Sequence, residues 1–179
     1  MKIVTRLVLL AALIALGAWL YTVLFPGPEK AIRKHLTKVA RLASIKPDQG
    51  LLGRASSIQE LANCFAPEIE ITLNLRGGSE HTFRKRDEII EVAKLAHARF
   101  KTLQIDFLDM NVTVAADKQS ATVNLTAKAS SSEEVDFQVQ EFKFTLQRIN
   151  GEWLIIRIET VRTLSRARMS DDLLSSART

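Results

Sequence analysis

The residues best suited to acid–base chemistry in this sequence are carboxylates within strand-like runs. A carboxylate that points into an apolar interior has a raised pKa and can act as a general base, whereas an outward carboxylate is an ordinary surface group. Arg157 shares a predicted strand face with Glu159, Trp153 and Ile155, so this arginine could line a cavity or pair with a neighbouring acid. The sequence leaves both roles open for five acids: Glu70, Asp106, Asp109, Glu141 and Glu159.

Neither the histidines nor the cysteine forms a recognisable metal or nucleophile pattern. His35, His81 and His97 are dispersed along the chain without metal-ligand spacing. The single cysteine, Cys64, lies beside apolar helix positions, which favours a buried structural thiol over a nucleophile. The sequence also lacks a phosphate-binding glycine loop, a Gly-x-Ser-x-Gly elbow and a dinucleotide fingerprint. We therefore expect no catalytic residue of these classes, no metal and no cofactor.

The composition suggests one folded domain joined to a segment of another kind. The chain has 179 residues, of which 46% are hydrophobic, and a formal charge of +5. Lys2 and Arg6 precede an apolar segment, which leaves an excess of about +3 on the remainder. That excess is small, and no basic block with interleaved aromatic residues accompanies it, so we expect no nucleic-acid partner.

The apolar segment covers residues 7–25 and contains no charged side chain. As a helix it would reach roughly 28 Å, close to the thickness of a bilayer core. Trp19 and Tyr21 lie toward its far end, where interfacial aromatic residues belong. We therefore expect residues 1–27 to form an uncleaved transmembrane anchor in the inner (cytoplasmic) membrane. A cleaved signal peptide is the alternative, with a candidate site inside the segment at residues 15–18.

Charge alone does not fix the orientation of this segment. Basic residues precede it and also follow it, in a predicted amphipathic helix over residues 28–44. A folded domain can translocate largely regardless of charge, while a short basic tail tends to stay inside, so we expect the domain to lie outside the cytoplasm. The basic stripe of that helix could face solvent or contact anionic lipid headgroups. It comprises Lys30, Lys34, Lys38 and Arg41.

Hydrophobic periodicity predicts three helices and six strands after the anchor. The second helix is placed from the capping-box spacing of Ser57 and Glu60, with a loop over residues 45–55 before it. The predicted helices cover residues 28–44, 57–66 and 84–100. The predicted strands cover residues 68–75, 80–83, 102–115, 121–130, 135–149 and 152–163.

The final hairpin, residues 141–161, gives the clearest strand signal. Two apolar-rich runs flank Asn150 and Gly151, the pair preferred in a type I′ turn. Apolar alternation changes phase within two strands, near residues 107–108 and 140–141. One-residue slips of this kind are produced by β-bulges, which bend a sheet. A bent sheet with helices on its concave side can enclose a cavity.

Three motifs carry a family resemblance: the helix-to-strand run 61–71, the helix start 86–90 and the hairpin strands 142–155. With them, residues 28–164 resemble the nuclear transport factor 2-like superfamily. The resemblance implies an α+β fold with a curved, mostly antiparallel sheet and three helices on its concave side, here preceded by one transmembrane helix. We expect residues 165–179 to form a flexible polar tail.

The resemblance leaves activity open, because the superfamily includes isomerases, dehydratases, polyketide cyclases and non-catalytic binders. Its ketosteroid isomerases use an aspartate base near the end of the first strand and a tyrosine. Here Asn74 takes the position of the base, and the only tyrosine, Tyr21, lies in the apolar segment. An amide cannot accept a proton at neutral pH, so this mechanism is disfavoured.

We therefore expect a membrane-tethered domain that binds a small hydrophobic ligand or a partner protein without catalysis. The membrane contact would come from residues 7–25, and the sheet could contact a partner protein or a second copy in a homodimer. The alternative is a small-molecule enzyme of isomerase, dehydratase or hydrolase type that uses a pocket carboxylate. The candidate pocket residues are Glu70, Asn74, Asp109, Glu141, Arg157 and Glu159.

Overall fold

The computed structural model of the protein describes residues 27–74, 80–132 and 138–163. The helices in these ranges are α2 (Pro28–Ala43), α3 (Leu51–Ala62) and α4 (Arg86–Arg99). The strands are β1 (Phe65–Asn74), β2 (Glu80–Lys85), β3 (Leu103–Val114), β4 (Ser120–Ser131), β5 (Gln138–Ile149) and β6 (Glu152–Thr163). The expected anchor, residues 1–27, lies almost wholly outside these ranges, and the expected tail, residues 165–179, lies wholly outside them.

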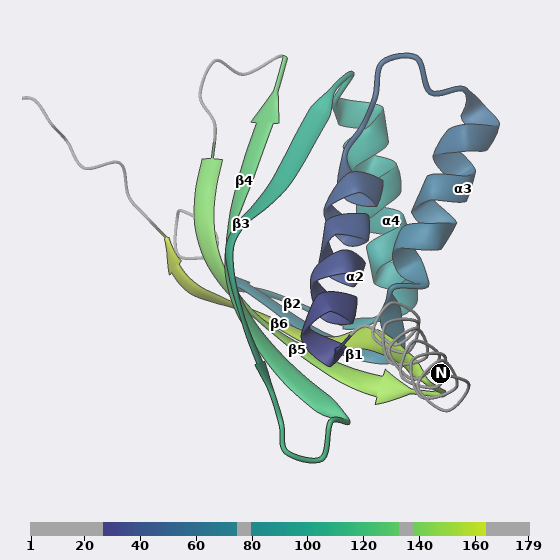
Figure 1. The fold of residues 1–179 in the computed structure, drawn as a ribbon. Coiled ribbons are helices and arrows are strands. Elements are labelled where there is room, and N and C mark those ends of the chain that lie inside the picture. Colours follow the sequence, from purple (N-terminus) through teal and green to yellow (C-terminus); the bar gives the residue numbers. More distant parts are fainter. Residues whose placement is uncertain (1–26, 75–79, 133–137, 164–179) are drawn as a thin grey trace, which may run out of the picture.

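The strands form one six-stranded sheet in the order β2-β1-β6-β5-β4-β3. Every neighbouring pair is antiparallel except β1 and β6, which run parallel. The sheet bends strongly, and the three helices lie together inside the bend (Figure 1). The predicted α+β architecture is confirmed in this form, with a curved mixed sheet covered by helices on its concave side.

The bend coincides with an extra residue in the edge strand β3. The pairing of β3 with β4 shifts between Leu108 and Asn111, and Asp109 within that step has a positive φ of 50°. An extra residue in the left-handed region is typical of a bulge and increases the local twist. The phase slip predicted near residues 107–108 is therefore confirmed.

The second predicted slip, near residues 140–141, lies on the neighbouring strand instead. The register of β5 against β4 is unbroken. The register of β5 against β6 shifts twice, and the unpaired residues are Ile156 and Val161, both in β6. The change of apolar phase in β5 does not itself mark a bulge, because the extra residues are accommodated by its partner.

The helices form where the sequence supplies a buried stripe. In α2, Pro28 occupies the first turn, and Ile32, Leu36 and Val39 are buried at helical spacing. The start of α3 was misplaced by the sequence prediction, since the helix begins at Leu51 instead of Ser57. The Oγ of Ser57 accepts a hydrogen bond from the side-chain nitrogen of Gln49 at 2.6 Å, so it does not cap a helix.

The core lies between α2, the start of β1 and the central strands. Its largest fully buried side chains are Ile32, Leu36, Val123, Leu146 and Ile155. Every residue classed as buried within the described ranges is apolar or is Cys64. The space between these elements is therefore filled by the chain's own side chains.

None of α2, α3 and α4 is long and apolar enough to cross a membrane, and no other described segment forms such a helix.

Candidate functional site

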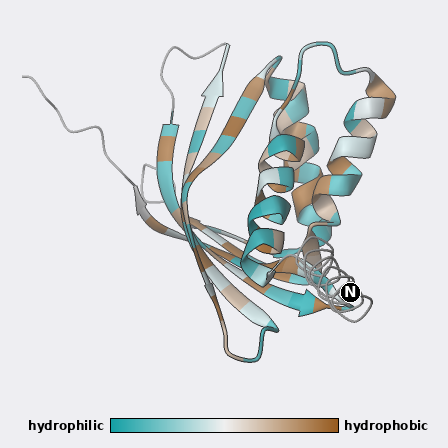
Figure 2. Cartoon of the chain, in the orientation of Figure 1, coloured by the Kyte–Doolittle hydropathy of each residue, from teal (hydrophilic) through white to brown (hydrophobic). Residues whose placement is uncertain are grey.

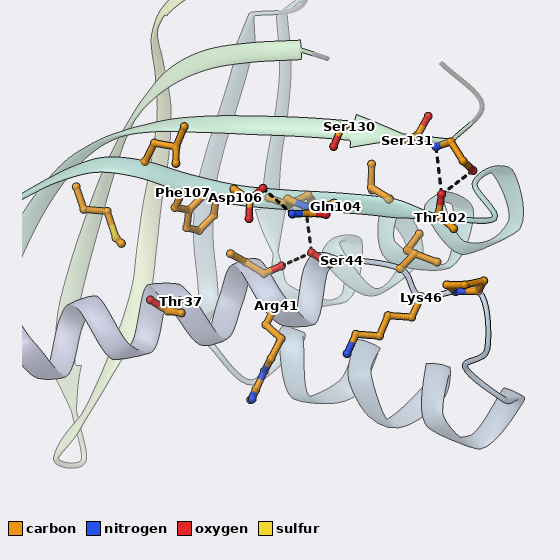
Figure 3. Close-up of a pocket in the computed structure, with 18 residues that line it drawn as sticks. Thr37, Arg41, Ser44, Lys46, Thr102, Gln104, Asp106, Phe107, Ser130 and Ser131 are labelled. Atoms are coloured by element: carbon orange, nitrogen blue, oxygen red, sulfur yellow. Dashed lines mark hydrogen bonds between the residues drawn. The ribbon is translucent and has the colours of Figure 1, made fainter. Parts of the chain in front are cut away.

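An open cleft of about 730 Å³ lies between the C-terminal part of α2 and β3, which is one of the two edge strands of the sheet. Apolar groups of both elements line it, including Ala40, Ile105 and Phe107. Polar side chains surround them (Figure 3). The polar lining consists of Thr37, Arg41, Ser44, Lys46, Thr102, Gln104, Asp106, Ser130, Ser131 and Ser132.

Ser44 joins the two walls of the cleft. It follows the last residue of α2 and takes an extended backbone conformation, which turns the chain toward β3. Its hydroxyl donates to the carbonyl of Ala40 at 2.8 Å and accepts from the peptide nitrogen of Ile105 at 3.0 Å. The next residue, Ile45, exchanges two backbone hydrogen bonds with Leu103, at 2.7 and 3.1 Å. These bonds fix the end of α2 to the beginning of β3.

Part of the β3 edge remains open to the cleft. The peptide groups of Leu103 and Ile105 point away from β4 and bond to Ile45 and Ser44. In an antiparallel ladder every second residue points its peptide groups to the same side, so the peptide groups of Phe107 also point away from β4. Phe107 itself lines the cleft. Beyond it, Arg33 donates to the carbonyl of Met110 at 2.7 Å. The cleft therefore offers peptide donors and acceptors as well as side chains.

Asp106 is the one carboxylate of the five predicted acids that lines this cleft. Its Oδ2 accepts a hydrogen bond of 2.9 Å from the side-chain nitrogen of Gln104, and Lys128 lies opposite on β4. Asp106 is thus placed to accept hydrogen bonds from a ligand.

Arg41 and Lys46 border the cleft but extend away from β3 (Figure 3). Both side chains are exposed. They therefore add positive charge to the outer side of the cleft without filling it.

Three of the candidate pocket residues come together on the outer face of the sheet. Arg157 lies 2.8 Å from Glu70 and 3.5 Å from Glu159, and the three side chains are 37–47% exposed. The unpaired residue Ile156 is the physical reason, because it places Arg157 and Glu159 on the face opposite the buried Ile155. These residues form a surface ion-pair network, which contributes little to stability.

The other three candidates also lie away from the cleft. Glu141 stands opposite Thr126 on the outer face of the sheet, and Asp109 is exposed at the β3 bulge. Asn74 ends β1, where its backbone pairs with Glu80. None of the six candidates lines the cleft described above.

The histidines lie on α2, β2 and α4, and the cysteine lies in the turn between α3 and β1. His35 Nε2 is 3.3 Å from the carbonyl oxygen of Cys64, and burial lowers the pKa of His35. Burial raises the pKa of the Cys64 thiol, which donates to the carbonyl of Glu60 at 3.3 Å. Burial, with a smaller effect of Arg54, also lowers the pKa of His97. Cys64 is thus held as a protonated thiol, the form expected of a structural residue.

No three His, Cys, Asp or Glu side chains within the described ranges are grouped so that they could hold a metal ion.

The residues of the cleft were mostly outside the sequence prediction. Asp106 was among the five acids and Arg41 was in the basic stripe, but the hydroxyl and amide groups carried no motif. They come from the end of α2, the start of β3 and the end of β4. Only pairing between distant segments brings them together.

Residues 48–159 match the SnoaL-like domain family. The chain belongs to this family. The match runs from the loop before α3 into β6, so it includes β3 but not α2. No curated protein sequence matches the chain.

Solved structures with the same fold extend this assignment to the nuclear transport factor 2-like fold. One is an NTF2-like protein with a cystatin-like fold from Novosphingobium aromaticivorans, at 17% identity and a TM-score of 0.60, covering 85% of this chain and 90% of that protein. Another is a putative scytalone dehydratase from the same organism, at 13% identity and a TM-score of 0.56, covering 80% and 95%. The Kfla4162 protein from Kribbella flavida shares 11% identity with a TM-score of 0.59, covering 74% and 88%. At these identities the likeness establishes the fold alone.

Proposed function

We propose that this chain is a membrane-tethered binding protein, whose SnoaL-like domain holds a small amphipathic molecule in the cleft between α2 and β3 without catalysing a reaction on it. The observation that carries the proposal is the lining of that cleft. Apolar side chains and hydrogen-bonding groups face one open space of about 730 Å³. Cavities of roughly 300–1,000 Å³ with such mixed linings are typical of small-molecule sites.

The placement of the acids supports binding over catalysis. Glu70 and Glu159 pair with Arg157 on the outer face of the sheet, and Glu141 shares that face. None of these three acids lines the cleft, so none can act as a base on a molecule held there. Only Asp106 of the five predicted acids lines the cleft.

The tether is supported by the sequence before α2. The uncharged run of residues 7–25 is long enough for a bilayer core, and α2 begins only three residues after it. A ligand that partitions into lipid would therefore be concentrated near the cleft.

The proposal is tested by the molecules that co-purify with the full chain in mild detergent, identified by native mass spectrometry. Thr37 is exposed and lines the cleft, so Thr37→Trp should obstruct it. Thr113 is exposed on the same strand as Phe107 but lies outside the cleft, so Thr113→Trp is the matched control. We expect a discrete small molecule on the unmodified chain and on the control, and its loss from Thr37→Trp. Equal retention by both variants, or no bound molecule at all, would contradict the proposal.

A second variant separates binding from catalysis. An isomerase, dehydratase or hydrolase built on this cleft would use Asp106 as its base. Asp106→Asn would then trap an unreacted substrate, and the co-purified molecule would change in mass or structure. The binding proposal predicts the same molecule on both chains, in lower amount at most.

A further inference from the structure

The outward face of α2 is strongly basic. The buried residues Ile32, Leu36 and Val39 mark the side that faces the sheet. At 100° per residue, the opposite side contains five positions, and all five are exposed. Four of them are basic, namely Lys30, Lys34, Lys38 and Arg41, and the fifth is Thr37. None is acidic. Figure 2 shows the visible side of α2 mainly in the hydrophilic colour.

The protein's own acids leave most of this charge uncompensated. Glu29 pairs with Arg33 at 2.9 Å, on the side of the helix next to β3. The Lys38 ammonium and the Glu60 carboxylate form a long ion pair of 3.8 Å, and both side chains are about half exposed. Within the described ranges, no carboxylate lies within ion-pair distance of Lys30, Lys34 or Arg41.

The geometry of the charges fits an extended surface. Lys30 and Arg41 are separated by eleven residues, or about 16 Å along the helix axis. Charges spread this far along one helix face cannot converge on a single phosphate, but they can contact several headgroups at once.

The position of the face in the chain favours lipid over nucleic acid. The helix begins directly after the apolar run of residues 7–25, which under the proposed function lies in the membrane. The sequence of α2 contains no Phe, Tyr or Trp on which a base could stack, and its one histidine, His35, contacts the carbonyl of Cys64 instead of lying on the basic face. We propose that α2 lies against the membrane surface with this basic face on anionic lipid headgroups. This inference rests on the proposed tether and adds an orientation to it.

The orientation has a consequence for the cleft. Thr37 and Arg41 belong both to the basic face and to the cleft lining. With α2 on the headgroups, the cleft opens beside the bilayer surface, where an amphipathic molecule could enter it without crossing bulk water. Each lysine or arginine near an anionic surface strengthens association about fivefold.

The test is the reactivity of lysines in the full chain reconstituted into vesicles. Acetylation by an N-hydroxysuccinimide ester is followed residue by residue with mass spectrometry. In vesicles of phosphatidylcholine and phosphatidylglycerol at a ratio of about 3:1, we expect Lys30, Lys34 and Lys38 to react at least fivefold more slowly than in pure phosphatidylcholine. Lys118, in the turn between β3 and β4, should react equally in both. Salt of about 1 M should abolish the protection, because the Debye length is then about 3 Å.

Charge-matched variants show whether the face itself is responsible. The triple variant K30Q/K34Q/R41Q should lose the protection of Lys38. The control R84Q/K94Q/R99Q removes the same number of exposed basic residues from β2 and α4 and should retain it. Equal behaviour of the two variants would overturn the proposal.

The failure of the tether would be seen separately. Flotation of the full chain with pure phosphatidylcholine vesicles after an alkaline carbonate wash reports insertion of the apolar segment alone. A chain that floats but shows no phosphatidylglycerol-dependent protection refutes the docking of α2 while leaving the tether intact. Equal protection of the same lysines by a soluble DNA duplex would refute the assignment of the face to lipid.

Discussion

Replacing Ser44 by alanine tests how the cleft is held together. The Ser44 hydroxyl donates to the Ala40 carbonyl at 2.8 Å and accepts from the Ile105 peptide nitrogen at 3.0 Å. Alanine removes both hydrogen bonds and leaves the Ile105 N–H without a protein partner at a half-buried position. A hydrogen bond of this kind contributes about 0.5–1.5 kcal/mol net, and an unpaired buried group costs about 1–3 kcal/mol. We expect the free energy of unfolding to fall by about 1–3 kcal/mol.

The assay is equilibrium unfolding in urea of the full chain in mild detergent, with the midpoint and slope compared between variants. The slope should be unchanged, because the surface exposed on unfolding is nearly the same. Ser56→Ala is the matched control, since Ser56 is exposed within α3 and its hydroxyl only approaches Glu60 at 3.5 Å. Alanine is a better helix former than serine, so the control should stay within about 0.5 kcal/mol of the unmodified chain. A Ser44→Ala effect no larger than that of the control would refute the role given to Ser44.

Three further predictions concern the core, a histidine and the β3 bulge. Leu146→Ala should lower the unfolding free energy by about 2–5 kcal/mol in urea titrations, whereas Leu95→Ala, at a side chain 68% exposed, should change it by less than about 1 kcal/mol. Because burial lowers the pKa of His35 below its ordinary value of 6.5, the unfolded chain binds a proton first. Stability should therefore be complete above pH 6.5 and decline as the pH falls below it, and His35→Gln should reduce this slope in pH-dependent unfolding; an unchanged slope would contradict the assignment. At Asp109, with a φ of 50°, glycine should be neutral or stabilising and valine should cost about 1–2 kcal/mol, so equal unfolding midpoints for the two variants would exclude strain at the bulge.

The strands could be predicted where a short local motif, such as a turn sequence, determines where they begin and end. Asn150 and Gly151 have φ angles of 52° and 86°, as the type I′ turn between β5 and β6 requires. The start of α3 was not predictable from periodicity, because Leu51 and Leu52 are 84% and 89% exposed and belong to no buried stripe. An apolar residue signals an element boundary only where the fold buries it.

The sequence also did not reveal which side chains of β6 share a face. Residues 154–156 are all apolar, so the sequence does not reveal which of them is the unpaired one. The extra residue proved to be Ile156, which moved Arg157 and Glu159 to the outer face. An unpaired residue reverses the side chains that follow it, so Arg157 and Glu159 lie on the face opposite Ile155.

The cleft depends on contacts between distant parts of the chain. The hydrogen bond from Ile105 to Ser44 joins residues 61 positions apart. Serine, threonine and glutamine at these positions carry no spacing that distinguishes them from ordinary surface residues. Only the placement of β3 at the edge of the sheet, beside the end of α2, gives them a common space.

The central claim, that the cleft between α2 and β3 holds a small molecule, is tested most directly by photo-crosslinking in native membranes. Leu108 lines the cleft and is 43% exposed, so it can be replaced by p-benzoylphenylalanine. Val161 is 57% exposed outside the cleft lining and serves as the control position. After irradiation, we predict a discrete mass adduct of a few hundred daltons at position 108 and none at position 161, in line with the size of a ligand for such a site. No adduct at position 108, or the same adduct at both positions, would contradict the claim.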